Sequence, residues 1–214
     1  MVDQPASPAR RINDPEGLRR RLVEVAFAAF STRGYGATPL QELRETAEVT
    51  GGALSHHFPT KKALAVAVLR ERVAQAVEEA WIDPVRLAPT AAAGVQAAFA
   101  GIIADLERNG AVSGCPLGNL GLELSGRDED FRSAIDEVFA RWRGAIADKL
   151  RADPNVDGCD LDPDAMATLV VAAYSGAMAM AKASQSAAPL RACAEQLASL
   201  MQAESGKPRR SPPS

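Results

Sequence analysis

Residues 38–64 read TPLQELRETAEVTGGALSHHFPTKKAL, and this stretch decides the fold. It opens with the pattern of a helix start, in which Thr38 is the N-cap, Pro39 takes the first helical position and Gln41 completes a capping box. Apolar residues then recur at helical spacing, at Leu40, Leu43 and Ala47. The pattern breaks after these residues, which predicts a short helix followed by a tight turn.

A second short helix is predicted over residues 51–57, with Thr50 as its N-cap. Pro59 ends this helix, because proline pushes the preceding residue out of the helical region, and Thr60 caps a third helix. The apolar anchors of the second helix are Leu54 and Phe58, and its outward residues are Thr50, Gly51, Ser55 and His56. A short, weakly buried helix after a tight turn is typical of a helix-turn-helix that reads the major groove of DNA.

In order and spacing, residues 18–69 resemble the tetracycline-repressor-like (TetR) family of bacterial regulators. The matching residues are Arg33-Gly34-Tyr35, Ala37-Thr38, Leu43, Ala47, Val49-Thr50, Gly52-Ala53-Leu54, His56-His57-Phe58-Pro59, Lys61 and Leu64. Four residues depart from the family pattern. Arg44 stands where the family usually has a small residue, and Glu48 stands where the turn usually has glycine. Gly51 stands where a lysine or other polar residue is common, and Ser55 stands where a tyrosine commonly touches a phosphate.

The resemblance implies an all-α chain, with an N-terminal three-helix DNA-binding domain of the helix-turn-helix type joined to a C-terminal helical domain for ligand binding and dimerisation. We expect a disordered arm over residues 1–13, the DNA-binding domain over 14–60, the effector-binding and dimerisation domain over 61–204, and a disordered tail over 205–214. The first long helix is predicted from Asp14 to a glycine cap at Gly34. Its buried stripe is Leu18, Leu22, Val25, Ala26, Ala29 and Phe30.

Composition favours a cytoplasmic protein. Of the 214 residues, 47% are hydrophobic, which is enough for a sizeable core. The three cysteines lack the spacing of a disulfide framework or a zinc site, and no signal peptide or membrane span is expected. The net charge of −3 is uneven: residues 1–75 hold 11 Lys and Arg against 8 Asp and Glu, and the remainder is acidic. A basic head on an acidic body suits phosphate binding, although the arginines taken singly also fit a solvated face.

The predicted DNA-contacting residues are Thr38, Thr50, Gly51, Ala53, Ser55, His56, His57 and Lys61. Hydroxyls can bond base edges or phosphates, and the methyl of Ala53 can meet that of a thymine. The resemblance implies that one histidine points at the DNA backbone while the other packs near Phe58; the alternative is that both fill space. Adjacent histidines diverge on a helix, so no metal site is expected. Lys61, at the start of its helix, is predicted to meet a phosphate.

The rest of the chain predicts further helices. A helix is expected from Lys61 to about Ala80, with breaks in the chain at Asp83-Pro84 and at Ala88-Pro89. Further helices follow over about 90–109, 131–150, 162–184 and 189–201. The run 114–125, GCPLGNLGLELS, also resembles a branch of the same family.

Two of these helices are candidates for assembly. By resemblance, the last two form a four-helix interface with their copies in a homodimer, at Leu169, Ala173, Gly176, Ala177, Met180, Leu197 and Leu200. Ordinary intramolecular core is the alternative. An effector pocket is expected in the body, lined by Phe99, Ile103, Cys115, Trp142, Tyr174 and Met178, although core packing explains these residues equally well.

Cys115 carries one chemical hypothesis. It precedes a predicted helix N-terminus, where a lowered thiol pKa would suit a sensor of oxidants or electrophiles. The competing interpretation is a small buried apolar residue.

The sequence therefore predicts a transcriptional regulator that binds a palindromic double-stranded DNA operator and is released from it by an unknown small molecule. Repression, the family's usual behaviour, is what the resemblance implies. The alternative is a DNA-binding regulator switched through Cys115. An enzyme is not expected, because no metal-ligand cluster, phosphate loop or nucleophile motif is present, and no cofactor is expected.

Overall fold

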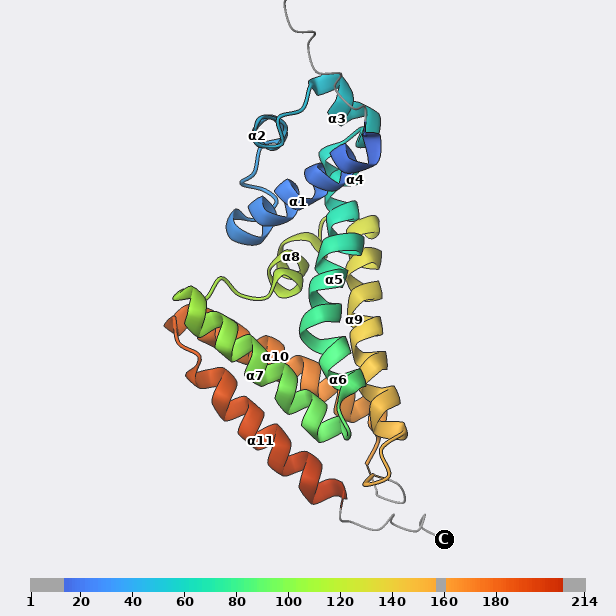
Figure 1. The fold of residues 1–214 in the computed structure, drawn as a ribbon, viewed down its shortest axis with the longest axis vertical. Helices are drawn as coiled ribbons and strands as arrows, with labels where there is room; N and C mark the ends of the chain where they lie inside the picture. The colour runs from blue at the N-terminus through green and yellow to red at the C-terminus, as the bar shows by residue number, and fades with distance from the viewer. Residues whose placement is uncertain (1–13, 157–160, 206–214) are drawn as a thin grey trace, which may run out of the picture.

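The computed structural model describes residues 14–156 and 161–205, and its regular elements are all helices. They are α1 (Pro15–Arg33), α2 (Leu40–Thr46), α3 (Gly51–His57), α4 (Lys61–Ala67), η1 (Val68–Val73), α5 (Ala74–Val77), η2 (Glu78–Ile82), α6 (Asp83–Leu87), α7 (Ala91–Asn109), α8 (Pro116–Leu124), α9 (Glu129–Arg151), α10 (Pro163–Ser184) and α11 (Ala188–Ser205). Figure 1 shows an elongated molecule with α1, α2 and α3 at one end and α7, α10 and α11 at the other. The predicted all-α fold is confirmed.

Local capping explains where the first helix lies. The Asp14 side chain accepts a hydrogen bond from the backbone N–H of Gly17 at 2.8 Å, and Gly34 ends the helix with a φ of 87°. Of the predicted stripe, Leu22, Ala26 and Phe30 are fully buried, and Val23 joins them. The others of the stripe are half-buried, because α1 packs on one side only.

The start of α2 differs from the prediction. Pro39, not Thr38, is the N-cap, and no side chain caps this helix. Thr38 is fully buried, and its hydroxyl donates to the carbonyl of Gly34 at 2.8 Å. Thr38 therefore holds the connection after α1 in place, and its prediction as a DNA contact is wrong because the side chain is out of reach of solvent.

The turn between α2 and α3 has an unusual backbone. Glu48 has a φ of 54°, a left-handed conformation that favours glycine and costs a residue with a β-carbon about 1 kcal/mol. The N–H of Val49 closes the turn on the carbonyl of Arg44 at 3.1 Å. Thr50 then caps α3 by accepting from the N–H of Ala53 at 3.2 Å, as predicted.

A single helical rod connects the two ends of the molecule. It runs without a break from α4 through η1, α5, η2 and α6 to Leu87, and η1 and η2 are π-helical segments (Figure 1). The predicted break at Asp83-Pro84 is wrong, whereas the predicted break at Ala88-Pro89 is confirmed. Pro84 is the second residue of α6 and follows the π-helical segment η2 directly, and the chain leaves the helix only at Ala88, whose ψ is 154°.

The remaining helices pack around the far half of this rod. Helix α9 lies along it, α10 packs on α9 and α11, and α7 packs on α6 and α11. Their predicted ends are mostly confirmed, with Thr90 capping the start of α7 and Gly110, at φ 66°, its end. At the centre, the ring of Trp81 lies 5.2 Å from that of Phe99, 5.0 Å from that of Trp142 and 4.8 Å from that of Tyr174.

Candidate nucleic-acid interface

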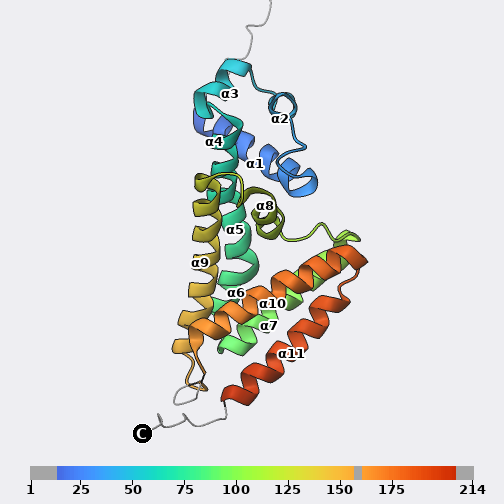
Figure 2. The same ribbon diagram turned by 180° about the vertical axis from the view of Figure 1, so that it is seen from behind.

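Helix α3 lies at the tip of the molecule, far from α10 and α11 (Figures 1 and 2). It is held from one side only, because Leu54 and Phe58 are each 4% exposed and belong to the hydrophobic core at the N-terminal end, which α1 to α4 form. The residues on its other side are exposed: Thr50, Gly51, Gly52, Ser55 and His56. The predicted outward face of this helix is confirmed.

The two histidines have different surroundings. His56 is exposed, whereas His57 is half-buried, with its ring 6.5 Å from that of Phe58. Ala53 is also half-buried, on the flank of the helix. His56 is thus placed to face a ligand, while His57 partly fills space at the base of α3. Among residues 14–156 and 161–205, no group of three or more His, Cys, Asp or Glu could hold a metal ion.

Lys61 does not point outward as predicted. Its ammonium donates to the carbonyl oxygen of Tyr35 at 2.5 Å and lies 4.1 Å from the centre of the Tyr35 ring. Burial lowers the pKa of this ammonium. In this conformation the charge of Lys61 fastens α4 to the connection between α1 and α2, and its phosphate contact stays a prediction.

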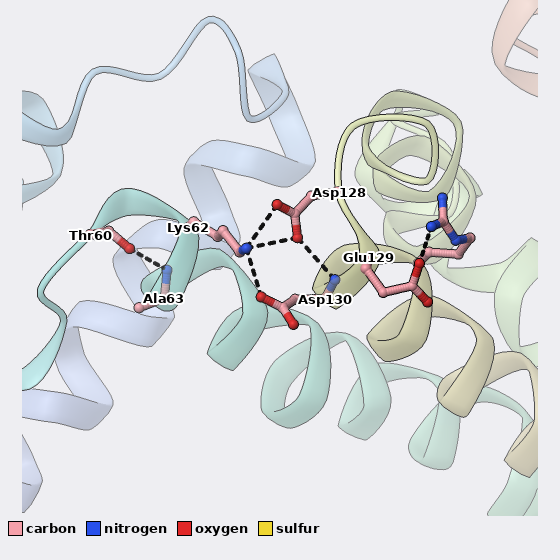
Figure 3. Close-up of polar contacts among 7 residues, drawn as sticks. Thr60, Lys62, Ala63, Asp128, Glu129 and Asp130 are labelled. Atoms are coloured by element: carbon pink, nitrogen blue, oxygen red, sulfur yellow. Dashed lines mark hydrogen bonds and ion pairs between the residues drawn. The ribbon is translucent and has the colours of Figure 1, made fainter.

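The neighbouring Lys62 joins the N-terminal end, formed by α1 to α4, to the body of the molecule, formed by α5 to α11 (Figure 3). Its ammonium lies 2.7 Å from the carboxylate of Asp128 and 2.6 Å from that of Asp130, at the start of α9. The hydrogen bond with Lys62 lowers the pKa of Asp128, which also caps α9 by accepting from the N–H of Asp130 at 2.9 Å. Lys62 thus ties the start of the rod to α9.

Helix α8 makes a second connection to the N-terminal end formed by α1 to α4. The carboxylate of Glu123 accepts the backbone N–H of Tyr35 at 2.8 Å and that of Gly36 at 2.6 Å. Both N–H groups lie in the connection between α1 and α2. Sequence reasoning missed Glu123, because nothing local in the sequence shows a contact across 87 or 88 residues.

The same α8 forms a wall of a cavity of about 420 Å³ between α8, α9 and α10. Its lining is mostly apolar and consists of Cys115, Gly118, Asn119, Gly121, Leu122, Ser125, Phe139, Ser175, Met178 and Ala179. Only Cys115 and Met178 of the six predicted pocket residues line it. The other four, Phe99, Ile103, Trp142 and Tyr174, are buried core residues that do not line it, and three of them are aromatic rings packed against one another.

The thiol of Cys115 does not have the predicted character. Burial raises its pKa, since the loss of hydration outweighs the backbone N–H groups of Leu117 and Gly118 that favour the thiolate. The prediction of a lowered pKa is wrong. Burial also raises the pKa of Cys193, and Cys159 lies outside the described residues.

Helix α10 leaves an apolar face uncovered in the single chain, on the side seen in Figure 2. Leu169 is 44% exposed and Met180 62% exposed, and small residues separate them. The exposed apolar and small residues of this face are Ala165, Leu169, Ala172, Gly176, Ala179, Met180 and Ala183. By length and composition α10 would also pass for a membrane span, but its opposite face is packed on α9 and α11.

The predicted dimer residues divide into two groups. Leu169, Gly176, Met180 and Leu200 are exposed and available to a partner. Ala177 and Leu197 are buried within the chain's own core, and Ala173 is half-buried against it. The prediction is wrong for Ala177 and Leu197, because α10 and α11 turn these positions toward their own protomer.

Two family sequence models match the chain, one in its N-terminal part and one in its C-terminal part. Residues 22–68 match the sequence model of bacterial regulatory proteins of the tetR family, and residues 91–196 match that of the C-terminal domain of LmrA/YxaF-like transcriptional regulators. The chain is 29% identical over 182 residues to the HTH-type transcriptional repressor DhaR of Mycobacterium sp. (strain GP1), covering 81% of this chain and 86% of the relative.

Two further similarities extend over most of the chain. The HTH-type transcriptional repressor NemR of Escherichia coli (strain K12) is 30% identical over 185 residues, covering 80% of this chain and 87% of the relative. The crystal structure of a TetR transcriptional regulator from Chloroflexus aurantiacus J-10-FL superposes with a TM-score of 0.77 at 24% identity, covering 92% of this chain and 98% of that one. The latter likeness concerns the fold.

Proposed function

Because the chain belongs to the TetR family of bacterial transcriptional regulators, we propose that it is a homodimeric, cytoplasmic repressor that leaves a palindromic DNA operator when a small molecule binds its C-terminal domain. In this proposal residues 14–60 bind DNA, and residues 61–204 bind the effector and dimerise. The observation that carries it is the position of α3, which stands at the tip of the molecule with Leu54 and Phe58 buried and its other side open.

The DNA contacts in this proposal come from the exposed side of α3. Thr50 and Ser55 offer hydroxyls to base edges or phosphates, and His56 offers a ring N–H. Gly51 and the half-buried Ala53 permit close approach of the helix backbone to the groove. His57 stands behind them, against Phe58. Seven residues make a helix of two turns, which fits the length over which a recognition helix contacts one major groove.

Selection of bound duplexes from random DNA tests the proposal. We expect the full-length protein to enrich an inverted repeat, because two copies of α3 related by a two-fold axis read the same half-site on opposite strands. The half-sites should lie about 10 base pairs apart, or a multiple of one helical turn, from centre to centre. Enrichment of a single unrepeated site, or of no site at low salt, would contradict dimeric operator recognition.

The cavity between α8, α9 and α10 supports the second half of the proposal. With about 420 Å³ and a mostly apolar lining, it suits a small molecule with an apolar body. Asn119, Ser125 and Ser175 add a few polar groups that can orient such a ligand. Gly121 and Leu122 of the cavity wall directly precede Glu123, whose carboxylate holds the connection between α1 and α2. A ligand that displaces α8 thereby has a route to the DNA-binding end.

A switch through Cys115 is the alternative. Cys115 lines the cavity, but the raised pKa of its thiol disfavours the thiolate that reacts with oxidants and electrophiles. We therefore expect Cys115→Ser to keep operator binding and to keep release by the inducer, because the substitution preserves size and leaves the cavity in place. A binding titration with and without inducer measures both. Full loss of the response with intact operator binding would instead favour the thiol switch.

A further inference from the structure

Arg44 lies beside the exposed side of the recognition helix, although it belongs to α2. Its backbone carbonyl closes the turn with the N–H of Val49 at 3.1 Å, which fixes the direction in which the side chain leaves α2. The side chain is 38% exposed. A β-carbon built on Gly51 would lie 3.8 Å from Nη1 of Arg44. The guanidinium thus stands next to the first residue of α3, on the side that α3 presents to solvent.

Five other cations around α1 to α4 are paired within the protein. Arg19 forms a two-pronged pair with Glu71, Arg33 lies 2.5 Å from Glu42, and Arg72 lies 2.6 Å from Glu24. Lys61 and Lys62 are engaged by the Tyr35 carbonyl and by the two aspartates of α9. Arg20 and Arg21 of α1 are exposed and lie outside these pairs, but they are not on the two helices of the helix-turn-helix. On α2 and α3, the arginine available to a polyanion is Arg44.

Arg44 is held far less tightly. Its ion pair is with Glu45 at 3.6 Å, which is longer than a hydrogen bond, and the carboxylate of Glu45 accepts from the amide of Gln41 at 2.9 Å. An exposed pair at this distance contributes little free energy. The guanidinium can therefore exchange Glu45 for a stronger acceptor at little cost.

Gly51 leaves room for this side chain. Its φ is not positive, so the backbone at the start of α3 does not require glycine. Its β-carbon would make only ordinary contact with Arg44, but a long side chain there would compete with the guanidinium for the same space. Because residue 51 is a glycine, the cation of this surface is Arg44 of α2. Its guanidinium occupies the space that a side chain on the first residue of α3 would otherwise fill.

We propose that Arg44 makes a phosphate contact that holds α3 in its groove. This inference rests on the proposed insertion of α3 into duplex DNA. In a helix-turn-helix the first helix crosses the DNA backbone while the second enters the major groove, and the forked donors of a guanidinium match the oxygens of a phosphate. A phosphate contact strengthens binding to any sequence, so Arg44 sets affinity and its salt dependence, whereas α3 sets base preference.

Arg44→Ala tests the assignment with a labelled duplex taken from the selection and with a scrambled duplex of equal length. Because a dimer carries two copies, we expect the slope of log affinity against log salt to become shallower by about 2, with affinity about tenfold lower or more at low salt. Both duplexes should lose affinity by similar factors. Arg44→Lys should keep the slope and lose less affinity, because the charge stays but the fork is lost.

Two further variants sharpen the result. Glu45→Gln should tighten binding to both duplexes, because it removes the anion beside Arg44, and this gain should shrink in the Arg44→Ala background. Arg141→Ala is the matched control: this exposed arginine of α9 pairs with Glu78 at 2.8 Å in the body, so its removal should leave the slope unchanged.

Three outcomes would overturn the inference. These are an Arg44→Ala slope and affinity equal to those of the unaltered protein, an Arg44→Lys variant as weak as Arg44→Ala, and a loss confined to one base position of the selected site. If Arg44→Ala unfolds, the other two variants still test the inference. Arg44→Lys should bind both duplexes more weakly than the unaltered protein, and Glu45→Gln should bind both more tightly. Each of the three outcomes would leave duplex binding by the unaltered protein, and with it the proposed function, intact. A failure of the unaltered protein to bind any duplex would instead contradict the proposed function itself.

Discussion

Gly176→Glu is expected to convert the protein into a monomer and to weaken operator binding about 100-fold to 10,000-fold. Gly176 is exposed in the middle of the apolar face of α10, and a β-carbon built there meets nothing within 4 Å in the single chain. The substitution therefore fits the protomer and removes a flexible glycine from a helix interior, which favours the helix. Across a dimer interface of small residues, however, a longer charged side chain would be buried without a partner.

The loss of affinity follows from the loss of the second half-site. When one copy of α3 is bound, the other acts at the high effective concentration set by the dimer, and this avidity is worth about 10² to 10⁴ in affinity. Sedimentation or light scattering measures the mass, and a titration with the selected duplex measures binding. A variant that stays dimeric and binds normally would show that the exposed face of α10 is not the interface.

Gly101→Glu is the matched control for this variant. Gly101 is also an exposed glycine inside a long helix, α7, and its built β-carbon likewise meets nothing within 4 Å. The same charge is added in the same helical setting. We expect this control to remain dimeric and to bind the selected duplex with unchanged affinity, so that a change seen only in Gly176→Glu is due to its position.

Glu123→Gln is expected to lower the free energy of unfolding by about 2 kcal/mol and to uncouple the cavity from the DNA-binding end. The carboxylate of Glu123 accepts two backbone N–H groups, from Tyr35 and Gly36, and hydrogen bonds to a charged acceptor contribute about 1.5 to 3 kcal/mol each before screening by solvent. The glutamine has one acceptor oxygen instead of two. Its NH₂ group would face one of the N–H donors and leave that donor unpaired.

Hydrogen exchange gives the most direct measurement of this effect. The amides of Tyr35 and Gly36 should be protected in the unaltered protein and exchange faster in Glu123→Gln, and the melting temperature should fall by about 4–8 °C. Any inducer identified with the unaltered protein should release the variant from DNA less completely. Unchanged protection at both amides would contradict the role of Glu123 as the connection from α8.

Glu129→Gln provides the control for charge alone. Glu129 lies near the start of α9, where its exposed carboxylate pairs with Arg132 on the same helix (Figure 3). The substitution changes the net charge by the same amount and touches no residue of the DNA-binding end. We expect the stability, the amide protection and the response to inducer to stay as in the unaltered protein.

The helices were predictable because most of their ends are decided by neighbours in the chain. Asp14, Thr50, Thr60 and Thr90 each cap a helix through the N–H of a residue three positions on, and Gly110 ends α7 in a left-handed conformation. The buried side of α3 was predictable for the same reason, since Leu54 and Phe58 lie one helical turn apart and share a face.

Side-chain directions were harder to predict. Lys61, Thr38 and Pro84 were each assigned from their own position in the chain, but their roles depend on groups that the fold brings near. Lys61 turns to the Tyr35 carbonyl, 26 residues away, and Pro84 stays in a helix because α7 and α9 pack on α6. Four of the six predicted pocket residues do not line the cavity between α8, α9 and α10, because periodicity identifies buried residues without showing which of them border a cavity.

By itself, the sequence determined the all-α class, the helix-turn-helix near the amino end, the residues that anchor α3 and the family. These depend on capping, turn and periodicity patterns within about ten residues, which physical chemistry ties directly to local conformation. Only the tertiary structure decided which cations remain available to DNA, which residues line the cavity and how α8 holds the DNA-binding end. The contacts of Lys61 and Glu123, for example, join residues 26 to 88 positions apart, and their free energy exists only once the helices have packed.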